Sequence, residues 1–316
     1  MTVSRLLPAT QRLVAEALGV YFTLLKILVP ALVIVKGLQM LGAVEWLGAV
    51  LSPLMGWLGL PDVMGVVWAA TLLTNIFTGL VVLFEVAGDT PLTVVQATVL
   101  GSLLLVGHSL PVEGAVARRA GVPWSVTVLL RVGGALLLGA LIHYGYGLGG
   151  WGEQTARLIW RPEPGPDTLS AWAWAQLQTL AMIFVIIFLL LVLLRLLRYL
   201  RLERLIHLAL TPLLRLLGIG RAAANVTVIG FMLGLSYGAG LVIRDVDAGV
   251  MNRRDSFLAL CFLGLCHSVI EDTLLILLLG ADVIGVLWVR IVFAVIVIAL
   301  LSRLARGRLD TCAPTP

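Results

Sequence analysis

Gly107-His108-Ser109-Leu110-Pro111-Val112-Glu113 is a polar stretch inside an otherwise almost wholly apolar run, and it occurs twice. Reading on by 159 residues gives Cys266-His267-Ser268-Val269-Ile270-Glu271-Asp272, which repeats the His-Ser pair and the acidic residue that follows it. The same offset, without a gap, aligns Pro53 with Pro212, Gly59 with Gly218, Gly79 with Gly238, Gly121 with Gly280 and Arg131 with Arg290. The sequence therefore predicts two copies of one unit.

The composition predicts an integral membrane protein. Hydrophobic residues make up 60% of the 316 positions and charged residues only 12%, more apolar surface than a water-soluble fold can bury. Apolar runs near the roughly 20 residues needed to cross a bilayer as helix lie at about 18–41, 63–87, 92–117, 123–146, 176–200, 222–243, 256–279 and 283–302. The expected partner is the lipid bilayer. The net charge of +5 does not indicate nucleic acid, because the arginines cluster at the ends of these runs.

The three cysteines predict neither a disulfide framework nor a zinc site. Cys266 lies beside His267, but adjacent helical residues point to different faces, so we expect no metal site and no cofactor. The chain also lacks Gly-x-Ser-x-Gly and His-Glu-x-x-His, the motifs that would indicate an intramembrane hydrolase. We therefore expect no enzymatic activity.

The distribution of arginine predicts that the two copies are inverted. Segment 41–62 has no Lys or Arg, whereas its equivalent 200–221 contains Arg201, Arg204, Arg215 and Arg221. By the positive-inside rule these segments lie on opposite sides of the membrane. Each copy must then cross an odd number of times, so one of its four apolar runs enters and leaves on the same side.

The second apolar run of each copy is the best candidate for such a re-entrant hairpin, since 74–79 and 234–240 contain glycine and small polar residues that can break a helix. The predicted fold is an all-α polytopic membrane protein with two inverted repeats, six transmembrane spans, two re-entrant hairpins and two interfacial amphipathic helices. The first interfacial helix is 43–58, with Trp46 and Trp57. The expected boundaries are 1–146 for the first repeat, 147–175 for an extracytoplasmic linker, 176–303 for the second repeat and 304–316 for a cytoplasmic tail.

Charged side chains at membrane depth need partners, since each costs at least about 2.5–3.5 kcal/mol to insert. Glu113 and Arg131 flank the turn at Gly121 at similar depth on antiparallel helices, and Asp272 and Arg290 repeat this arrangement. We expect two supporting ion pairs. They would either clasp neighbouring helices together or line a path for a solute or ion.

Other polar residues within the runs are candidate binding groups. His267 and Glu271 are four residues apart and would share a helix face, whereas Val112 takes the second position in the first copy. The second cluster is therefore the better candidate for a titrating or coordinating site. The alternative is that the histidines only pack, and that the glycines only let helices approach closely. The candidates for binding solute or ion are Thr74, Asn75, Thr78, Ser236, Tyr237, His108, Ser109, His267, Ser268 and Glu271.

Three stretches carry a resemblance to a known family: 105–113, 233–243 and 266–275. In order, they resemble the nucleoside recognition (Gate) domain family of prokaryotic membrane proteins, which is similar to the core of concentrative nucleoside transporters and to segments of ferrous-iron transporters. The resemblance implies a repeat built of a span, an interfacial helix, a re-entrant hairpin and two further spans. It also implies a central site formed by the hairpin tips and by the broken helices that follow them.

We therefore expect a secondary transporter of a small polar solute, nucleoside-like or other, that works by alternating access with H⁺ or Na⁺ as the candidate coupling ion. We expect it in a prokaryotic cytoplasmic membrane with both termini in the cytoplasm, as a monomer or a homo-oligomer. One alternative is a membrane scaffold or accessory subunit that transports nothing. A further alternative is a divalent-metal permease.

Overall fold

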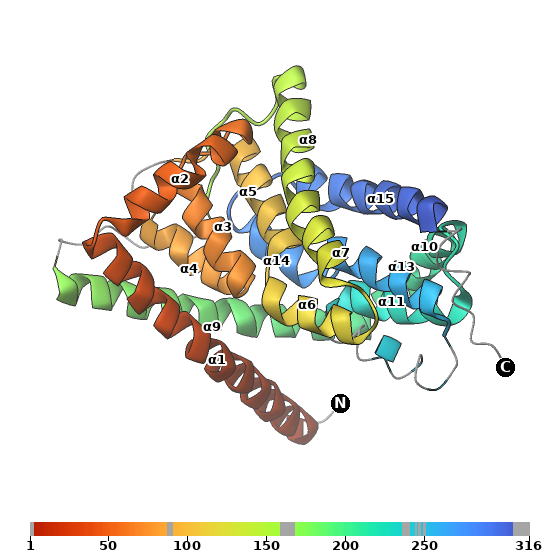
Figure 1. Ribbon diagram of the computed structural model, residues 1–316. Helices are drawn as coiled ribbons and strands as arrows, with labels where there is room; N and C mark the ends of the chain where they lie inside the picture. The colour runs from red at the N-terminus through yellow and green to blue at the C-terminus, as the bar shows by residue number, and fades with distance from the viewer. Residues whose placement is uncertain are drawn as a thin grey trace.

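The computed structural model describes residues 3–86, 91–158, 168–235, 241–243, 245, 248 and 251–305. These residues form helices and their connections, with no β-strand among them (Figure 1). The predicted all-helical fold is thus confirmed. The helices of the first half are α1 (Val3–Met40), α2 (Ala43–Trp57), α3 (Met64–Leu73), α4 (Ile76–Val86), α5 (Val94–Gly107), α6 (Leu110–Arg119), α7 (Trp124–Val128), the π-helical turn η1 (Leu129–Gly133) and α8 (Gly134–Gly149).

The second half follows a similar order. Its helices are α9 (Leu169–Tyr199), α10 (Leu202–Leu216), α11 (Arg221–Leu233), α13 (Arg253–Leu265), α14 (Glu271–Leu277), the π-helical turn η2 (Ile284–Val289) and α15 (Arg290–Ala305). The turns that follow α6 and α14 place Gly121 and Gly280 at φ of +98° and +75°. This left-handed backbone favours glycine, which explains why these two positions keep it in both halves.

Among the described residues, five helical segments are long and apolar enough to cross a membrane: Leu13–Leu38, Val94–Arg119, Trp124–Gly149, Leu169–Leu197 and Ile284–Leu304. They correspond to five of the six predicted spans. The sixth, predicted at 256–279, is divided into α13 and α14 by residues 266–270, so it does not form one long helix. The exact number of crossings stays a prediction.

The predicted hairpin at 63–87 is a pair of short helices, α3 and α4, separated at Thr74 and Asn75. The two helices pack closely because position 79 carries no side chain: a Cβ on Gly79 would lie 1.9 Å from Thr71 Oγ1. In the second half, α11 ends at Leu233. The expected tip residues Ser236 and Tyr237 lie outside the described residues.

The long helices α1 and α9 run antiparallel along one side of the molecule (Figure 1). Arg195 Nη2 lies 2.5 Å from Glu16 Oε2, and Lys36 Nζ lies 5.8 Å from the centroid of a Trp172 ring. Early residues of α1 therefore meet late residues of α9, and the reverse. The first helices of the two halves therefore run in opposite directions.

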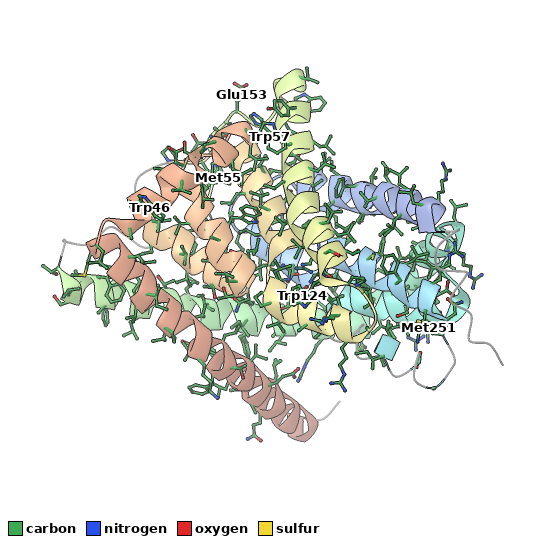
Figure 2. The ribbon with its side chains drawn as sticks, viewed as in Figure 1. Trp46, Met55, Trp57, Trp124, Glu153 and Met251 are labelled. Carbon is green, nitrogen blue, oxygen red and sulfur yellow. The ribbon has the colours of Figure 1, made fainter. Side chains whose placement is uncertain are left out.

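The predicted interfacial helices are separate elements, α2 and α10. Trp46 and Trp57 of α2 are both exposed and lie on the outer surface of the first half (Figure 2). Their contact with the membrane interface stays a prediction.

Helices α5 and α13 form the centre of the core. Every residue from Ala97 to Gly107 is buried, as is every residue from Leu258 to Leu265. A helix that is apolar on all sides must be surrounded by protein or lipid. Helix α5 ends directly before His108 and Ser109, and α13 ends one residue before His267 and Ser268, so the core fixes where each His-Ser pair lies.

Candidate functional site

Two helix breaks present the histidines. In the first half, α5 ends at Gly107 and α6 begins at Leu110, so His108 and Ser109 lie between two helices. In the second half, residues 266–270 separate α13 from α14. Ser109 and Ser268 have φ of +52° and +45°, a conformation that costs energy for any residue other than glycine. Both copies keep this costly backbone at the equivalent position, which is typical of functional sites.

The breaks bring the two imidazole rings together. His108 Nε2 lies 3.1 Å from His267 Nε2, and the ring centroids are 5.0 Å apart. Each ring is anchored by its other nitrogen: His108 Nδ1 lies 3.0 Å from the carbonyl of Leu104, and His267 Nδ1 lies 2.7 Å from that of Leu263. Because a carbonyl oxygen can only accept, both Nδ1 atoms must carry hydrogen. In a neutral ring Nε2 is then an acceptor, so two lone pairs face one another.

Glu113 completes the contact. Its Oε1 lies 3.3 Å from His267 Nε2 and 3.5 Å from His108 Nε2. Its Oε2 accepts a hydrogen bond from Arg131, which also donates to the carbonyl of His108. The predicted pair of Glu113 with Arg131 is therefore present, and all four side chains are buried. A buried charge is stable only where it is paired and hydrogen-bonded, which the arginine provides here.

The second predicted pair, Asp272 with Arg290, is not formed among the described residues. Arg290 instead donates to three carbonyls, those of Leu265 at 3.1 Å, His267 at 3.0 Å and Leu105 at 3.5 Å. Asp272 Oδ2 is buried without a hydrogen-bond partner in the described part of the chain. The physical reason is reach: the aspartate side chain is one methylene shorter than that of Glu113. The carbonyls bind Nε and Nη2 of Arg290, while its Nη1 is also buried without a hydrogen-bond partner in the described part of the chain.

The arginines also join the two halves in a reciprocal way. Arg131 donates to the carbonyl of Gly264 at 3.4 Å, and Arg290 donates to that of Leu105 at 3.5 Å. Gly264 and Leu105 are equivalent positions under the 159-residue offset. A π-helical segment lies at each arginine: η1 contains Arg131, and η2 ends directly before Arg290. Single π-helical turns inside α-helices are frequent at functional sites, and nothing in the sequence predicted them.

The tip of the first hairpin touches the first break. Ser109 Oγ donates to the carbonyl of Thr74 at 2.5 Å, and its amide donates to the carbonyl of Thr71 at 3.2 Å. Asn75 Oδ1 accepts from the amide of Thr78 at 2.9 Å and lies 3.3 Å from its hydroxyl. Asn75 therefore caps α4, a structural role that the sequence did not predict.

The second break also lies against α11, the first helix of the predicted second hairpin. The amide of Val269 donates to the carbonyl of Phe231 at 3.0 Å, and a Cβ on Gly234 would lie 2.9 Å from Ser268 Oγ. Gly234 itself has φ of +106°, so both the space and the backbone require glycine there.

The expected pairing of His267 with Glu271 on one helix face is wrong. Because α14 begins at Glu271, His267 lies before the helix, and the four-residue spacing no longer places the two side chains on one face. The carboxylate near His267 is Glu113, which comes from the other half. Residues so far apart in the chain give no spacing signal. Only the paired motifs at one offset hinted that the two breaks belong together.

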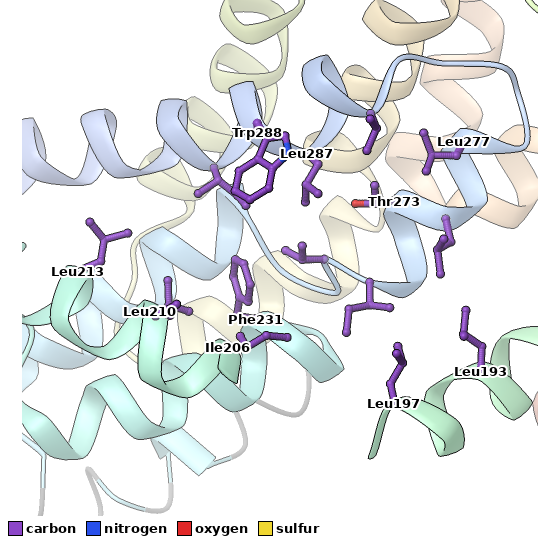
Figure 3. A pocket seen from close by; sticks show the side chains of 16 residues that line it. Leu193, Leu197, Ile206, Leu210, Leu213, Phe231, Thr273, Leu277, Leu287 and Trp288 are labelled. Carbon is purple, nitrogen blue, oxygen red and sulfur yellow. The ribbon is translucent and has the colours of Figure 1, made fainter. Parts of the chain in front are cut away.

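An apolar cavity of about 620 Å³ lies behind the second break, between α9, α10, α14 and η2 (Figure 3). Val269 and Ile270 of the break line it, and Thr273 is its one polar side chain among mostly leucine, isoleucine and aromatic neighbours. Hydrocarbon walls cannot replace the hydration of a polar solute. This cavity is therefore a poor site for such a solute, in contrast to the cluster of His108, His267, Glu113 and Asp272.

The chain matches a family described as nucleoside recognition (Gate) over two segments, residues 21–123 and 180–282. Both ends of the match are displaced by 159 residues, the offset of the His-Ser motif. The chain belongs to this family. The two Gate segments contain both histidines, Glu113 and Asp272, while Arg131 and Arg290 lie just beyond them.

The Gate chain is also 29% identical over 285 residues to an uncharacterized membrane protein, YvoD, of Bacillus subtilis (strain 168), which covers 87% of this chain and 88% of the relative. No solved structure matches the chain. The chain is thus a membrane protein, as its composition predicts, and it contains two Gate segments.

Proposed function

We propose that this Gate protein is a secondary transporter built from two inverted repeats, and that a small polar or charged species crosses the membrane at the junction of its histidines. The observation that carries the proposal is the buried cluster of His108, His267, Glu113 and Asp272, to which each half contributes one histidine and one carboxylate. Ionisable groups inside a membrane are costly, and they generally mark the paths of solutes, ions or protons.

Two features support inversion of the repeats. The first helices of the halves, α1 and α9, run antiparallel, as the contacts of Glu16 with Arg195 and of Lys36 with Trp172 require. The hydrogen bonds of Arg131 and Arg290 across the junction are reciprocal. Both follow if a two-fold axis in the membrane plane passes between the histidines, an arrangement that places transporter sites near mid-membrane.

The breaks supply what a mid-membrane site needs. Helix ends at residues 107–110 and 265–271 leave backbone amides and carbonyls without partners inside a helix. Arg131 and Arg290 bind carbonyls of this kind, those of His108 and His267, so the breaks hold two cationic side chains at the site. Six spans and two re-entrant hairpins would place the hairpin tips beside this junction, as the hydrogen bond of Ser109 to Thr74 does in the first half. The same threading puts the arginine-rich segment 200–221 and both termini in the cytoplasm of a prokaryotic cell.

Coupling to H⁺ or Na⁺ is part of the proposal. His108 and His267 can take up a proton between their Nε2 atoms, which lie at hydrogen-bond distance. Glu113 Oε1 faces the same point and would stabilise that proton or another cation. The chemistry of the cluster suits binding and passage, and we propose no reaction at it.

Accessibility of Ser268 to water tests the transporter against a membrane scaffold. Ser268→Cys on a cysteine-free background keeps a small side chain at the half-buried break. Alternating access requires that a membrane-impermeant thiol reagent reaches this position in right-side-out and in inside-out vesicles. Leu263→Cys, at a fully buried position of α13, is the matched control and should react in neither preparation.

The opposite result is equally clear. If Ser268→Cys reacts from one side only, or from neither while exposed positions react, the site does not alternate. The cluster would then hold helices together in a scaffold or accessory subunit, and the transporter proposal would fail.

A further inference from the structure

Three donor atoms of the cluster surround one point. His108 Nε2, His267 Nε2 and Glu113 Oε1 are separated by 3.1, 3.3 and 3.5 Å. A tetrahedral zinc ion with bonds of roughly 2.0–2.1 Å holds its ligand atoms about 3.3 Å apart. The three distances lie on both sides of this value. The donors are therefore spaced as a bound metal ion would space them, without a large movement of either half.

The protonation of the rings leaves the same point short of a cation. Both Nδ1 atoms donate to carbonyls, those of Leu104 and Leu263, so both Nε2 atoms of neutral rings are acceptors. Two acceptors and a carboxylate oxygen within 3.5 Å repel one another unless something positive lies between them. A proton satisfies one pair of atoms, whereas a metal ion satisfies all three.

The surroundings orient these donors as outer ligands do in metalloproteins. A metal-bound histidine generally donates its other ring hydrogen to a carbonyl or carboxylate, which fixes the tautomer and the ring. Leu104 and Leu263 provide those carbonyls here. A metal-bound carboxylate is itself hydrogen-bonded, and Arg131 binds Glu113 through Oε2, which leaves Oε1 turned to the histidines.

Asp272 provides a second, independent observation. Its Oδ2 is buried without a hydrogen-bond partner among the described residues, and it lies 3.9 Å from His108 Nε2. A small shift of this side chain, or a bridging water, would make it the fourth ligand. The set would then be two imidazoles and two carboxylates, one of each from either half.

We propose that His108, His267, Glu113 and Asp272 bind a divalent transition-metal ion of the Zn²⁺ or Fe²⁺ type. Resting on the transport function proposed above, this ion is the species carried. Imidazole nitrogen selects such metals over Mg²⁺ and Ca²⁺, which prefer oxygen ligands. The net charge of the site also agrees with passage of the ion. The negative charges of Glu113 and Asp272 equal in number the positive charges of Arg131 and Arg290. A dication would therefore be held by its ligand bonds without excess negative charge at the site, and it could leave.

The sequence predicts no metal site but leaves a divalent-metal permease as an alternative, and the geometry of these four side chains favours that alternative. Sequence spacing reveals ligands only when they lie near one another in the chain, and these histidines are 159 residues apart. Cys266 is next to His267 in the chain, but its sulfur is not part of the group formed by the ligand atoms of His108, Glu113 and His267. A Cys266→Ser variant should therefore keep the site.

Metal binding is tested on the purified full-length chain carrying an affinity tag without histidine. Co²⁺ is the probe, because a tetrahedral site gives it visible absorption bands, and Zn²⁺ should displace it while Mg²⁺ and Ca²⁺ should not. The variants His108→Gln and His267→Gln should weaken Co²⁺ binding at least about tenfold. His143→Gln and His207→Gln, at the remaining two histidines of the chain, are the matched controls and should bind as the unmodified protein does.

A second measurement on the unmodified protein guards against variants that do not fold. Zn²⁺ should raise its Tm in detergent, and EDTA should reverse the rise, because a ligand that binds only the folded state stabilises it. Absence of stoichiometric Co²⁺ binding and of the Tm shift overturns the metal site. Binding that survives both His108→Gln and His267→Gln overturns it as well.

Uptake of Zn²⁺ by proteoliposomes distinguishes a transported metal ion from a resident one. Proteoliposomes that contain the protein should take up Zn²⁺, detected by a fluorescent chelator inside, and the His267→Gln variant should lose the uptake. Binding without uptake contradicts transport of the metal and leaves a resident ion. Two-sided reactivity of Ser268→Cys together with no metal binding leaves a transporter of another species, so the two proposals fail in different experiments.

Discussion

The Nε2 atoms of His108 and His267 lie 3.1 Å apart, although 159 residues separate the two histidines in the chain. Each ring comes from the break that follows a helix whose second part is buried, and each is anchored to a carbonyl four residues earlier. Movement of one half against the other at this junction would change this contact. The junction is therefore where movement of the protein and occupancy of the site would be coupled.

Neutralising Glu113 alone should damage folding. Glu113→Gln leaves the buried Arg131 without its carboxylate, and breaking a buried pair in this way costs about 3–5 kcal/mol. Glu113→Gln together with Arg131→Met removes both charges and should recover most of that loss. The measurement is thermal unfolding in detergent. The exposed carboxylate Glu16, paired with Arg195, provides the control, because Glu16→Gln should change stability by less than about 1 kcal/mol.

Neutralising Asp272 should be tolerated far better. Its Oδ2 has no hydrogen-bond partner within the described residues, so Asp272→Asn breaks no hydrogen bond to an arginine, and Arg290 keeps its bonds to three carbonyls. We expect a Tm close to that of the unmodified protein, in contrast to Glu113→Gln, together with weaker binding of Co²⁺. Equal loss of stability in the two variants would mean that Asp272 supports the fold as Glu113 does.

The contrast between these carboxylates shows what the sequence could and could not predict. The gap-free repeat, the helical class and the pair of Glu113 with Arg131 followed from motif offset, composition and helix geometry. The absence of the pair of Asp272 with Arg290 depends on one methylene and on three carbonyls that compete for the guanidinium. The meeting of His108 with His267 depends on packing between halves. No pattern along one chain encodes either.

Gly79→Ala should separate α3 from α4. The new methyl group would lie 1.9 Å from Thr71 Oγ1, and overpacking of this kind costs about 1–3 kcal/mol. Thr71→Ala removes the clashing hydroxyl, so the double variant should regain part of the lost Tm. Gly145→Ala on α8 meets no atom within 4 Å and should be neutral or slightly stabilising. A harmless Gly79→Ala would show that the two helices are not held at this distance.

Asn75 should have a structural role as the N-cap of α4. Asn75→Ala removes the acceptor for the amide of Thr78 and should cost about 1 kcal/mol, whereas Asn75→Ser can still accept that hydrogen bond. The Tm of Asn75→Ser should therefore exceed that of Asn75→Ala. Uptake of Zn²⁺ then distinguishes the roles: if Asn75→Ser is stable but takes up no ion, the amide also contacts the permeating species, and if it transports normally, Asn75 serves the helix alone.

Inversion of the halves is best tested at Gly56 and Arg215, which are equivalent under the 159-residue offset and are both exposed. A side chain at Gly56 would meet no atom within 4 Å. Gly220 is less suitable as a labelling position in the second half, because a Cβ there would lie 2.4 Å from Asp255 Oδ2. Single cysteines at Gly56 and Arg215, on a cysteine-free background, should react from opposite sides of the membrane: Gly56→Cys in intact cells, and Arg215→Cys only after permeabilisation. The arginines of 200–221 predict the second result. Reaction of both from one side would make the repeats parallel, remove the reason for re-entrant hairpins, and leave the reciprocal arginine bonds without a two-fold axis to explain them.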